Sequence, residues 1–167
     1  LPYGYDQRTL AVVPAIAVSL APSSAIFAID AIDAPQKMVT LRAEVVNNRE
    51  GKSDGVLTLK VPPGWTVSPA AQPFALTRAG ERALYEFQVG AATIDHRAAR
   101  IEAVAQSAGR EYREGYTTIR HRDLETRYLY KDAVTTVRGV DVRIAPGLRV
   151  GYVMGIGDDV PAGIAQL

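Results

Sequence analysis

Apolar and polar residues alternate along most of the chain, and this period of two predicts β-strands rather than helices. In the clearest case Val39, Leu41 and Val45 are separated by Thr40 and Glu44. A strand of this kind has one apolar and one polar face, as in a sheet that covers a core on one side. Such segments recur with Pro, Gly and Ser turns between them, so the sequence predicts a sandwich of about seven strands.

We therefore predict an all-β fold, an immunoglobulin-like β-sandwich over residues 9–120 that follows a leader over residues 1–8. Pro14 interrupts the first apolar segment, which indicates an edge strand or a strand that changes partner. The turn Pro62-Pro63-Gly64 ends a later strand. The predicted core contains Val39, Leu41, Val45, Leu57, Leu59, Tyr85, Phe87 and Ile101.

The pattern changes after Ile119. Residues 121–132 are charged and irregular, which predicts a linker, and residues 133–167 predict the truncated beginning of an α/β domain. There, residues 148–154 form a continuous apolar run, typical of a strand buried on both faces, and Pro161 opens a helix after a glycine turn. Without its covering helices this strand is expected to pair with a sheet edge or with a second molecule, giving a dimer. The first residue, Leu1, is not Met, so we expect an excised piece of a larger protein.

Composition narrows the function classes. Hydrophobic residues make up 47% and charged residues 22% of the chain, and the formal net charge is +1. Neither half carries the strong single-sign charge of a nucleic-acid-binding protein. No apolar run approaches the roughly 20 residues of a membrane-spanning helix. There are no cysteines, which excludes disulfides and thiolate metal sites.

The residues that carry chemistry give no catalytic pattern. Neither His96 nor His121 has the spacing of a metal motif, so we predict no catalytic residue, no metal and no cofactor. Gly155 and Gly157 follow an apolar run, as in a nucleotide-binding loop, but the third glycine is absent. Asp158 and its acidic neighbour would repel a phosphate, and they are better interpreted as helix caps.

Three aromatic residues are the candidates for ligand binding. The only tryptophan, Trp65, can stack on a sugar, although an indole after a Pro-Gly turn more often covers one end of a core. Tyr112 and Tyr116 share one strand face and can form an aromatic shelf, but core edges use tyrosine in the same way.

Several motifs resemble a known family. They are Asn47-Asn48, residues 59–65 (Leu-Lys-Val-Pro-Pro-Gly-Trp), Gly80-Glu81 and the strand with Tyr112 and Tyr116. This region resembles the NPCBM-associated domain of alpha-galactosidases. Residues 12–14, 140–141, 145–152, 154–155 and 157–161 are similar to large bacterial proteins of the LmbE/PIG-L deacetylase type.

The resemblance implies a zinc-dependent N-acetylglucosaminyl deacetylase domain before the sandwich and a glutamine-amidotransferase-like α/β domain after it. It also implies a secreted or periplasmic protein. Relatives often carry Tyr-Pro-His where this chain has Ile119-Arg120-His121-Arg122. The deacetylase's zinc motif has no counterpart here, so no catalytic residue carries over.

The sequence thus favours a non-catalytic structural or interaction module that spaces or docks neighbouring domains of its parent protein. The alternative is a carbohydrate-binding accessory domain with a glycan as its partner. Neither hypothesis involves nucleic acid or a membrane span. The two hypotheses differ in whether an exposed aromatic residue, above all Trp65, stacks on a sugar.

Overall fold

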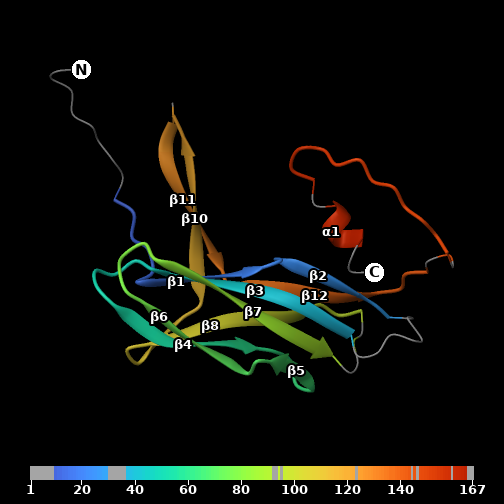
Figure 1. The fold of residues 1–167 in the computed structure, drawn as a ribbon, viewed down its shortest axis with the longest axis horizontal. Helices are drawn as coiled ribbons and strands as arrows, with labels where there is room; N and C mark the ends of the chain where they lie inside the picture. The colour runs from blue at the N-terminus through green and yellow to red at the C-terminus, as the bar shows by residue number, and fades with distance from the viewer. Residues whose placement is uncertain are drawn as a thin grey trace.

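A computed structural model describes residues 10–29, 37–91, 94, 96–122, 124–143, 145, 147–158 and 160–164, so the predicted leader over residues 1–8 lies outside it. The described residues form strands and one short helix (Figure 1). These are β1 (Ile16–Ala21), β2 (Ser24–Ala28), β3 (Lys37–Asn47), β4 (Ser53–Lys60), β5 (Trp65–Ser68), β6 (Ala71–Leu76), β7 (Arg82–Ala91), β8 (Ala99–Ser107), β9 (Arg110–Tyr112), β10 (Glu114–His121), β11 (Leu124–Asp132), β12 (Val134–Val140) and α1 (Val160–Ile164).

Two sheets pack face to face. The first is antiparallel, with the order β1-β3-β7-β5. The second has the order β2-β12-β8-β4-β6, and β9 also pairs with β8. Only β2 and β12 run parallel in the described pairings. This confirms the predicted all-β, immunoglobulin-like sandwich.

The core lies between the two sheets and is built from the inward positions of alternating strands. Of the predicted core residues, Leu41, Val45, Leu57, Leu59, Phe87 and Ile101 are buried. Val39 and Tyr85 are partly buried and pack against this cluster from its margin. Burial of side chains of this size contributes about 1.5–3 kcal/mol each. The period-two pattern therefore identified the core correctly.

Strands that change sheets explain why the structure has more strands than the predicted seven. β1 belongs to the first sheet and β2 to the second, and Pro22 lies between them. β5 and β6 make the same change across Pro69. Both prolines follow a cis peptide bond. At each of these places a proline separates two short strands that lie in different sheets.

The predicted boundary at residue 120 is wrong. Residues 124–132, predicted as part of a linker, form β11 and pair with β10. β12 lies inside the second sheet between β2 and β8, and Ala133, Thr135 and Val137 are fully buried. The pattern was missed because Thr135 takes an inward position, where its hydroxyl donates to the carbonyl of Pro22 at 2.7 Å. The sandwich therefore extends to Val140.

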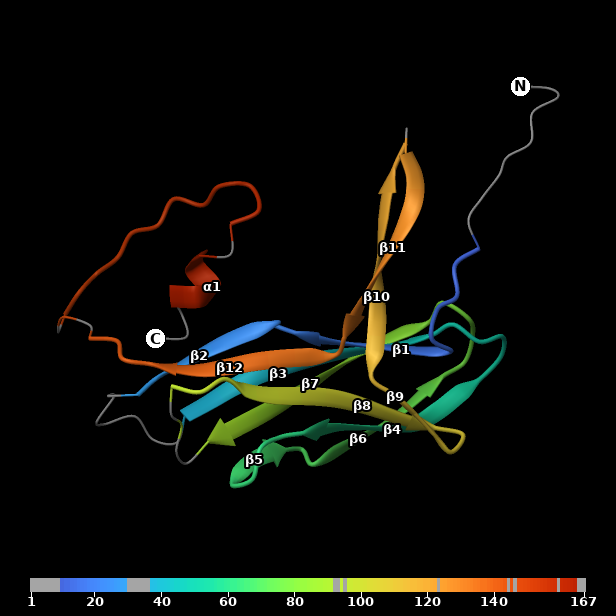
Figure 2. The same ribbon diagram turned by 180° about the vertical axis from the view of Figure 1, so that it is seen from behind.

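The last strand of the sandwich is split in two. β9 pairs with the end of β8, at Ala105 to Ser107, and β12 pairs with its beginning, at Ala99 to Glu102. Both lie on the same side of β8 and run in the same direction. Residues 114–132, here called the arm, leave the sheet between them as the hairpin β10–β11. Both ribbon views show the arm projecting from the sandwich (Figures 1 and 2).

The segment after Val140 does not form the predicted strand. Residues 148–154 have no regular secondary structure, and Val150, Val153 and Met154 are exposed. α1 begins beside Pro161, as the sequence predicted, but it has only five residues. No helix in the described ranges is long and apolar enough to cross a membrane. That these residues begin an α/β domain stays a prediction.

Candidate interaction site

The arm has two different faces, because residues directly opposite each other in a hairpin share a face. Tyr116 lies opposite Tyr130, and Thr118 lies opposite Tyr128. The rings of Tyr116 and Tyr128 are in tilted contact, with centroids 5.8 Å apart. We call the face with Tyr116, Tyr128 and Tyr130 the tyrosine face.

The tyrosine face is tied to the body of the molecule. The hydroxyl of Tyr116 donates to Asn48 Oδ1 at 2.9 Å, and that of Tyr130 donates to the carbonyl of Val12 at 2.6 Å. Asn48 in turn donates through Nδ2 to the carbonyl of Pro14 at 2.8 Å. The arm is thus held by polar contacts to the chain before β1 and to the loop after β3.

The opposite face of the arm, here called the outer face, carries Thr117, Ile119, Arg127, Leu129 and Lys131. Ile119 is 53% exposed and Leu129 is 58% exposed. Thr117 lies opposite Leu129, and Ile119 lies opposite Arg127. Two large apolar side chains therefore lie in neighbouring pairs on a surface that faces solvent.

Gly115 fixes where the arm crosses the sandwich. A Cβ atom at this position would lie 2.5 Å from the carbonyl oxygen of Val18 in β1. Only glycine allows two backbones to approach this closely. β10 therefore crosses the edge strand β1 in direct backbone contact.

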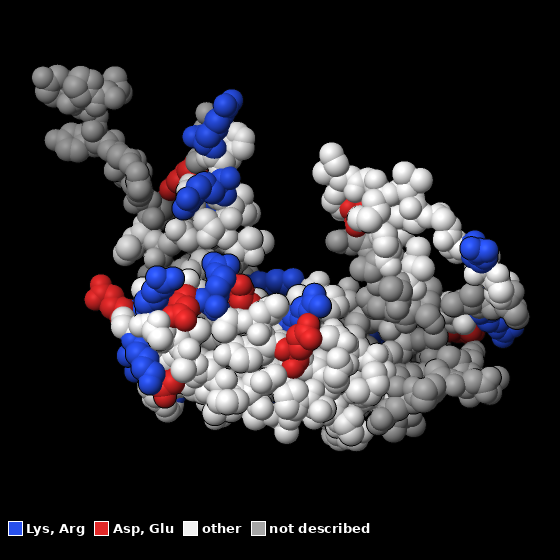
Figure 3. Space-filling model, in the orientation of Figure 1, with Lys and Arg blue, Asp and Glu red and all other residues white. Residues whose placement is uncertain are grey.

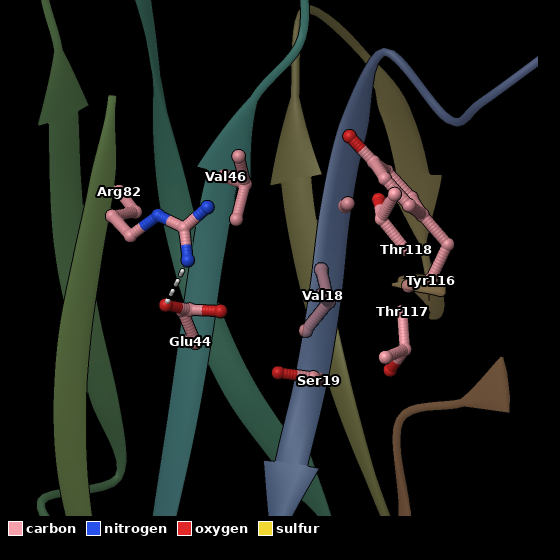
Figure 4. Close-up of a pocket in the computed structure, with 10 residues that line it drawn as sticks. Val18, Ser19, Glu44, Val46, Arg82, Tyr116, Thr117 and Thr118 are labelled. Carbon is pink, nitrogen blue, oxygen red and sulfur yellow. Dashed lines mark hydrogen bonds and ion pairs between the residues drawn. The ribbon is translucent and has the colours of Figure 1, made fainter. Parts of the chain in front are cut away.

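A crevice of about 350 Å³ lies beside this crossing (Figure 4). Its wall is Gly115 to Thr118 of β10, and no residue of β11 lines it. Its floor comes from the first sheet, where Arg82 Nη1 lies 3.3 Å from Glu44 Oε1. The remaining lining residues are Ala17, Val18, Ser19 and Val46. The crevice thus opens along the edge of β10 that does not pair with β11.

An ion-pair network surrounds the base of the arm on the second sheet. Arg100 lies 3.1 Å from Asp132 of β11 and 3.5 Å from Glu102, and Arg113 lies 3.6 Å from Glu102. Arg113 also pairs with Glu111, and its guanidinium is the largest cause of the lowered pKa of that carboxyl. These groups are exposed, so each pair contributes little alone. Together they connect β8, β9 and β11 where the arm leaves the sheet.

Charge is distributed unevenly between the arm and the body. On the face shown in Figure 3, acidic and basic side chains are mixed over the sandwich, whereas basic ones predominate on the upper part of the arm. Arg120 of β10 and Arg127 of β11 are exposed basic residues of the arm, and Arg127 lies 3.4 Å from Glu125.

The three predicted binding residues do not form one site. Trp65 packs on Phe27, with ring centroids 6.2 Å apart, and lines a hollow of about 430 Å³ that Ala99 of β8 also lines. Tyr112 packs against the core and pairs with Ala105, six residues further along β8, or roughly 20 Å away. Tyr116 lies on the arm. The predicted aromatic shelf of Tyr112 and Tyr116 is divided by the end of β9.

The histidines and the glycine turn lie in separate, exposed surroundings. His96 and His121 are exposed, and no group of three possible ligands gathers within the described residues. Asp158 Oδ2 accepts hydrogen bonds from the Tyr152 hydroxyl at 2.6 Å and the Gly155 amide at 3.1 Å. The Tyr152 hydroxyl is the main cause of the lowered pKa of Asp158. This carboxylate closes the turn before α1, and its predicted partner in capping, Asp159, lies outside the described residues.

Sequence reasoning missed the arm, and with it Gly115, Ile119 and Leu129. The signal was weak, because a hairpin that covers no core has polar residues on both faces. Tyr128 and Tyr130 alternate with Leu129, but this run is too short to stand out among charged neighbours. Gly115 marks the crossing of two backbones, which a glycine in a strand does not reveal by itself.

Comparison with known proteins gives the fold alone. No family model matches the chain, and no curated protein matches it. Among solved structures, it is similar to a FixG-related protein from Vibrio parahaemolyticus, with a TM-score of 0.44, 12% identity and coverage of 74% of this chain and 98% of that one. A PapD-like domain of human CEP192 gives a TM-score of 0.39, 8% identity and coverage of 84% and 96%. Similarity at this level carries no inference about function.

Proposed function

We propose that this chain is a non-catalytic interaction module, which docks a neighbouring domain of its parent protein through the outer face of the arm. The observation that carries the proposal is the position of the arm inside the last strand of the sandwich. β9 and β12 both pair with β8, so the sheet closes without the residues between them.

The arm adds no described apolar side chain to the core, since no fully buried hydrophobic residue lies between Ala105 and Ala133. Ordering a residue costs about 1–2 kcal/mol of backbone entropy, which the arm does not recover by burial. Its exposed Ile119 and Leu129 are instead suited to contact with another surface. An apolar centre with a charged margin, here Arg127 and Lys131, is the usual arrangement of a protein interface.

The resemblance to deacetylase-type proteins supports the same proposal, because there a sandwich of this kind stands between two other domains. A module that spaces or docks its neighbours requires surface rather than a reactive site. The described residues offer an exposed arm and a crevice beside it, both of which suit recognition of a protein surface.

This function is tested by replacing Leu129 of the full gene product with a photo-crosslinking amino acid and identifying the crosslinked segment. The same group at Arg138, which is exposed on β12, is the control. We expect position 129 to crosslink to one defined segment outside residues 1–167 and position 138 to give no such product. Equal crosslinking at both positions, or none at 129, would contradict the proposal.

Carbohydrate binding is the second candidate, favoured by the partly exposed Trp65 beside Pro62 and Ile94. An indole on the floor of an open hollow can stack against a sugar ring. Tryptophan fluorescence during titration with oligosaccharides distinguishes the candidates. A saturable change that is lost in Trp65→Phe supports sugar binding, and no change at about millimolar sugar supports the docking module.

A further inference from the structure

We propose that the free edge of β10 pairs with the same edge of a second copy of this chain. The two arms would then form one four-stranded antiparallel sheet in the order β11-β10-β10-β11 about a twofold axis. The inference concerns the edge of the arm rather than its outer face, so it does not depend on the proposed function.

The hydrogen bond at the base of the arm shows which backbone groups are free. The amide of Ala133 donates to the carbonyl of Arg113 at 2.8 Å, whereas the Ala133 carbonyl accepts from the Ala103 amide of β8, so this single bond ends the β10–β11 ladder and marks its hydrogen-bonded positions. In an antiparallel ladder hydrogen-bonded pairs alternate with non-hydrogen-bonded ones. Thr117 therefore directs its amide and carbonyl toward β11, whereas Tyr116 and Thr118 direct theirs toward the open edge.

The two edges of the arm are protected differently. Proteins guard exposed strand edges with charged residues, proline or a covering segment. β11 carries Glu125, Arg127 and Lys131, and Leu10 and Ala11 lie with it around a hollow of about 210 Å³. Residues 115–119 of β10, Gly-Tyr-Thr-Thr-Ile, contain neither charge nor proline. They border the open crevice, so the β10 edge is the one left available for pairing.

The sequence of β10 is complementary to itself when two copies run antiparallel about Thr117. Glu114 then lies opposite Arg120 of the other copy, which places opposite charges together at both ends. Gly115 lies opposite Ile119, a small residue against a large one. Tyr116 lies opposite Thr118, and both direct their backbone groups toward the partner. This register pairs the outward backbone groups of Tyr116 and Thr118, and it brings Arg120, which lies where the β10–β11 ladder shifts register, near Glu114.

The twofold arrangement also suits the shape of the site. In this register residues 116–119 of one copy lie beside residues 115–118 of the other, which form the wall of the crevice. Because each copy presents the same surface, the contact closes on itself and forms a dimer rather than a fibre. A hairpin of two strands is marginally stable alone, and pairing would give each arm the further strands it lacks.

Sedimentation of the full chain at concentrations up to about 1 mM tests the dimer, with charge reversals as variants. Glu114→Arg alone and Arg120→Glu alone place like charges opposite each other, and each is expected to weaken self-association about tenfold. The double reversal is expected to restore it. An equimolar mixture of the two single variants is expected to form heterodimers, because all four facing charges are then opposite in sign.

Thr118→Pro removes an outward amide without removing a hydrogen bond of the hairpin, so it is expected to give a folded monomer. Circular dichroism checks that each variant is folded. A strictly monomeric native chain would overturn the proposal. The β10 edge would then be available only to a strand of a different protein. A dimer that Glu114→Arg, Arg120→Glu and Thr118→Pro each leave unchanged, or that is lost on removal of residues 141–167, would overturn it as well.

Discussion

Asn47 is the polar centre of the loops at one end of the sandwich. It is fully buried at the end of β3, where Nδ2 donates to the carbonyls of Gly51 at 2.8 Å and Arg78 at 3.2 Å. Oδ1 accepts from the Arg49 amide and from the Ser53 hydroxyl, both at 3.0 Å. This one side chain thus satisfies backbone and hydroxyl groups from two separate loops.

Asn47→Ala is expected to lower the free energy of unfolding by about 3 kcal/mol, because four hydrogen bonds of a fully buried side chain are lost, one of them to the buried Ser53 hydroxyl. The neighbouring Asn48→Ala is the control. Asn48 is only partly buried, so its loss is expected to cost about 1 kcal/mol. Urea unfolding of the two variants measures both values. Equal destabilisation would show that Asn47 is not the centre of the loop network.

Glu81 gives a prediction for pH dependence. Its Oε2 accepts from the Thr77 hydroxyl at 2.7 Å, from the Thr77 amide at 2.6 Å and from the Arg78 amide at 3.2 Å. These bonds, led by the Thr77 hydroxyl, lower the pKa of Glu81 below its ordinary value of 4.5. Because the folded pKa is depressed, the stabilisation is present above 4.5 and is lost as the pH falls through the folded pKa.

Glu81→Gln is therefore expected to be less stable than the native chain near neutral pH, with a difference that shrinks in acid. Urea unfolding at a series of pH values between about 7 and 3 follows this difference. Thr77→Val removes the main hydroxyl donor and is expected to reduce the same pH dependence. A difference that stays constant across the series would show that Glu81 titrates normally.

At the scale of elements, the crossing of β10 over β1 depends on a single glycine. Gly115→Ala places a methyl group against the Val18 carbonyl, and backbone must move to accept it. We expect a loss of about 1–3 kcal/mol in the free energy of unfolding, as for other overpacked sites. Gly151→Ala is the matched control, because nothing lies within 4 Å of its Cβ position. Thermal unfolding of the pair decides the point, and equal midpoints would contradict the close crossing.

The elements that the sequence predicted well are those whose two faces differ. Residues such as Leu41, Leu57 and Phe87 point into the core and their neighbours point to water, so period-two alternation is strong there. β11 has no buried residue among those whose burial is described, and β12 uses Thr135 at an inward position. Residues 148–154 are apolar without a buried strand around them. Hydrophobic pattern reports burial, and it fails where a strand serves a purpose other than filling the core.

The candidate site was the least predictable part for the same reason. The predicted binding residues were three aromatic side chains, Trp65, Tyr112 and Tyr116. Trp65 and Tyr112 lie beside positions far apart along β8, and Tyr116 lies on the arm, away from both. Only the three-dimensional pairing of β9 and β12 with β8 defines the arm. That pairing joins segments far apart in sequence, and no local sequence pattern predicts it.

At the scale of the whole molecule, the sandwich is expected to fold without the arm. The Ala133 amide already donates to the Arg113 carbonyl, so Gly-Gly in place of residues 114–132 can close the gap between β9 and β12. We expect this variant to unfold cooperatively, within about 1 kcal/mol of the native chain. Val137→Asp in β12 is the contrasting variant, since a buried charge there is expected to prevent folding. Circular dichroism distinguishes them, and an unfolded Gly-Gly variant would make the arm part of the fold.

The split last strand has a consequence for the order of folding. Joining β9 and β12 through an unstructured loop of about 20 residues would cost about 3 kcal/mol of closure entropy. A hairpin removes much of that cost, because its pairs form locally, within roughly 1–10 μs, and its two ends finish side by side. As the arm closes, it brings Arg113 next to Ala133 and so aligns both halves of the strand before either has docked on β8. The arm would then turn a pairing between strands far apart in sequence into one between strands that already lie side by side. Stopped-flow refolding of the Gly-Gly variant, whose connection is already short, measures the folding rate without the arm.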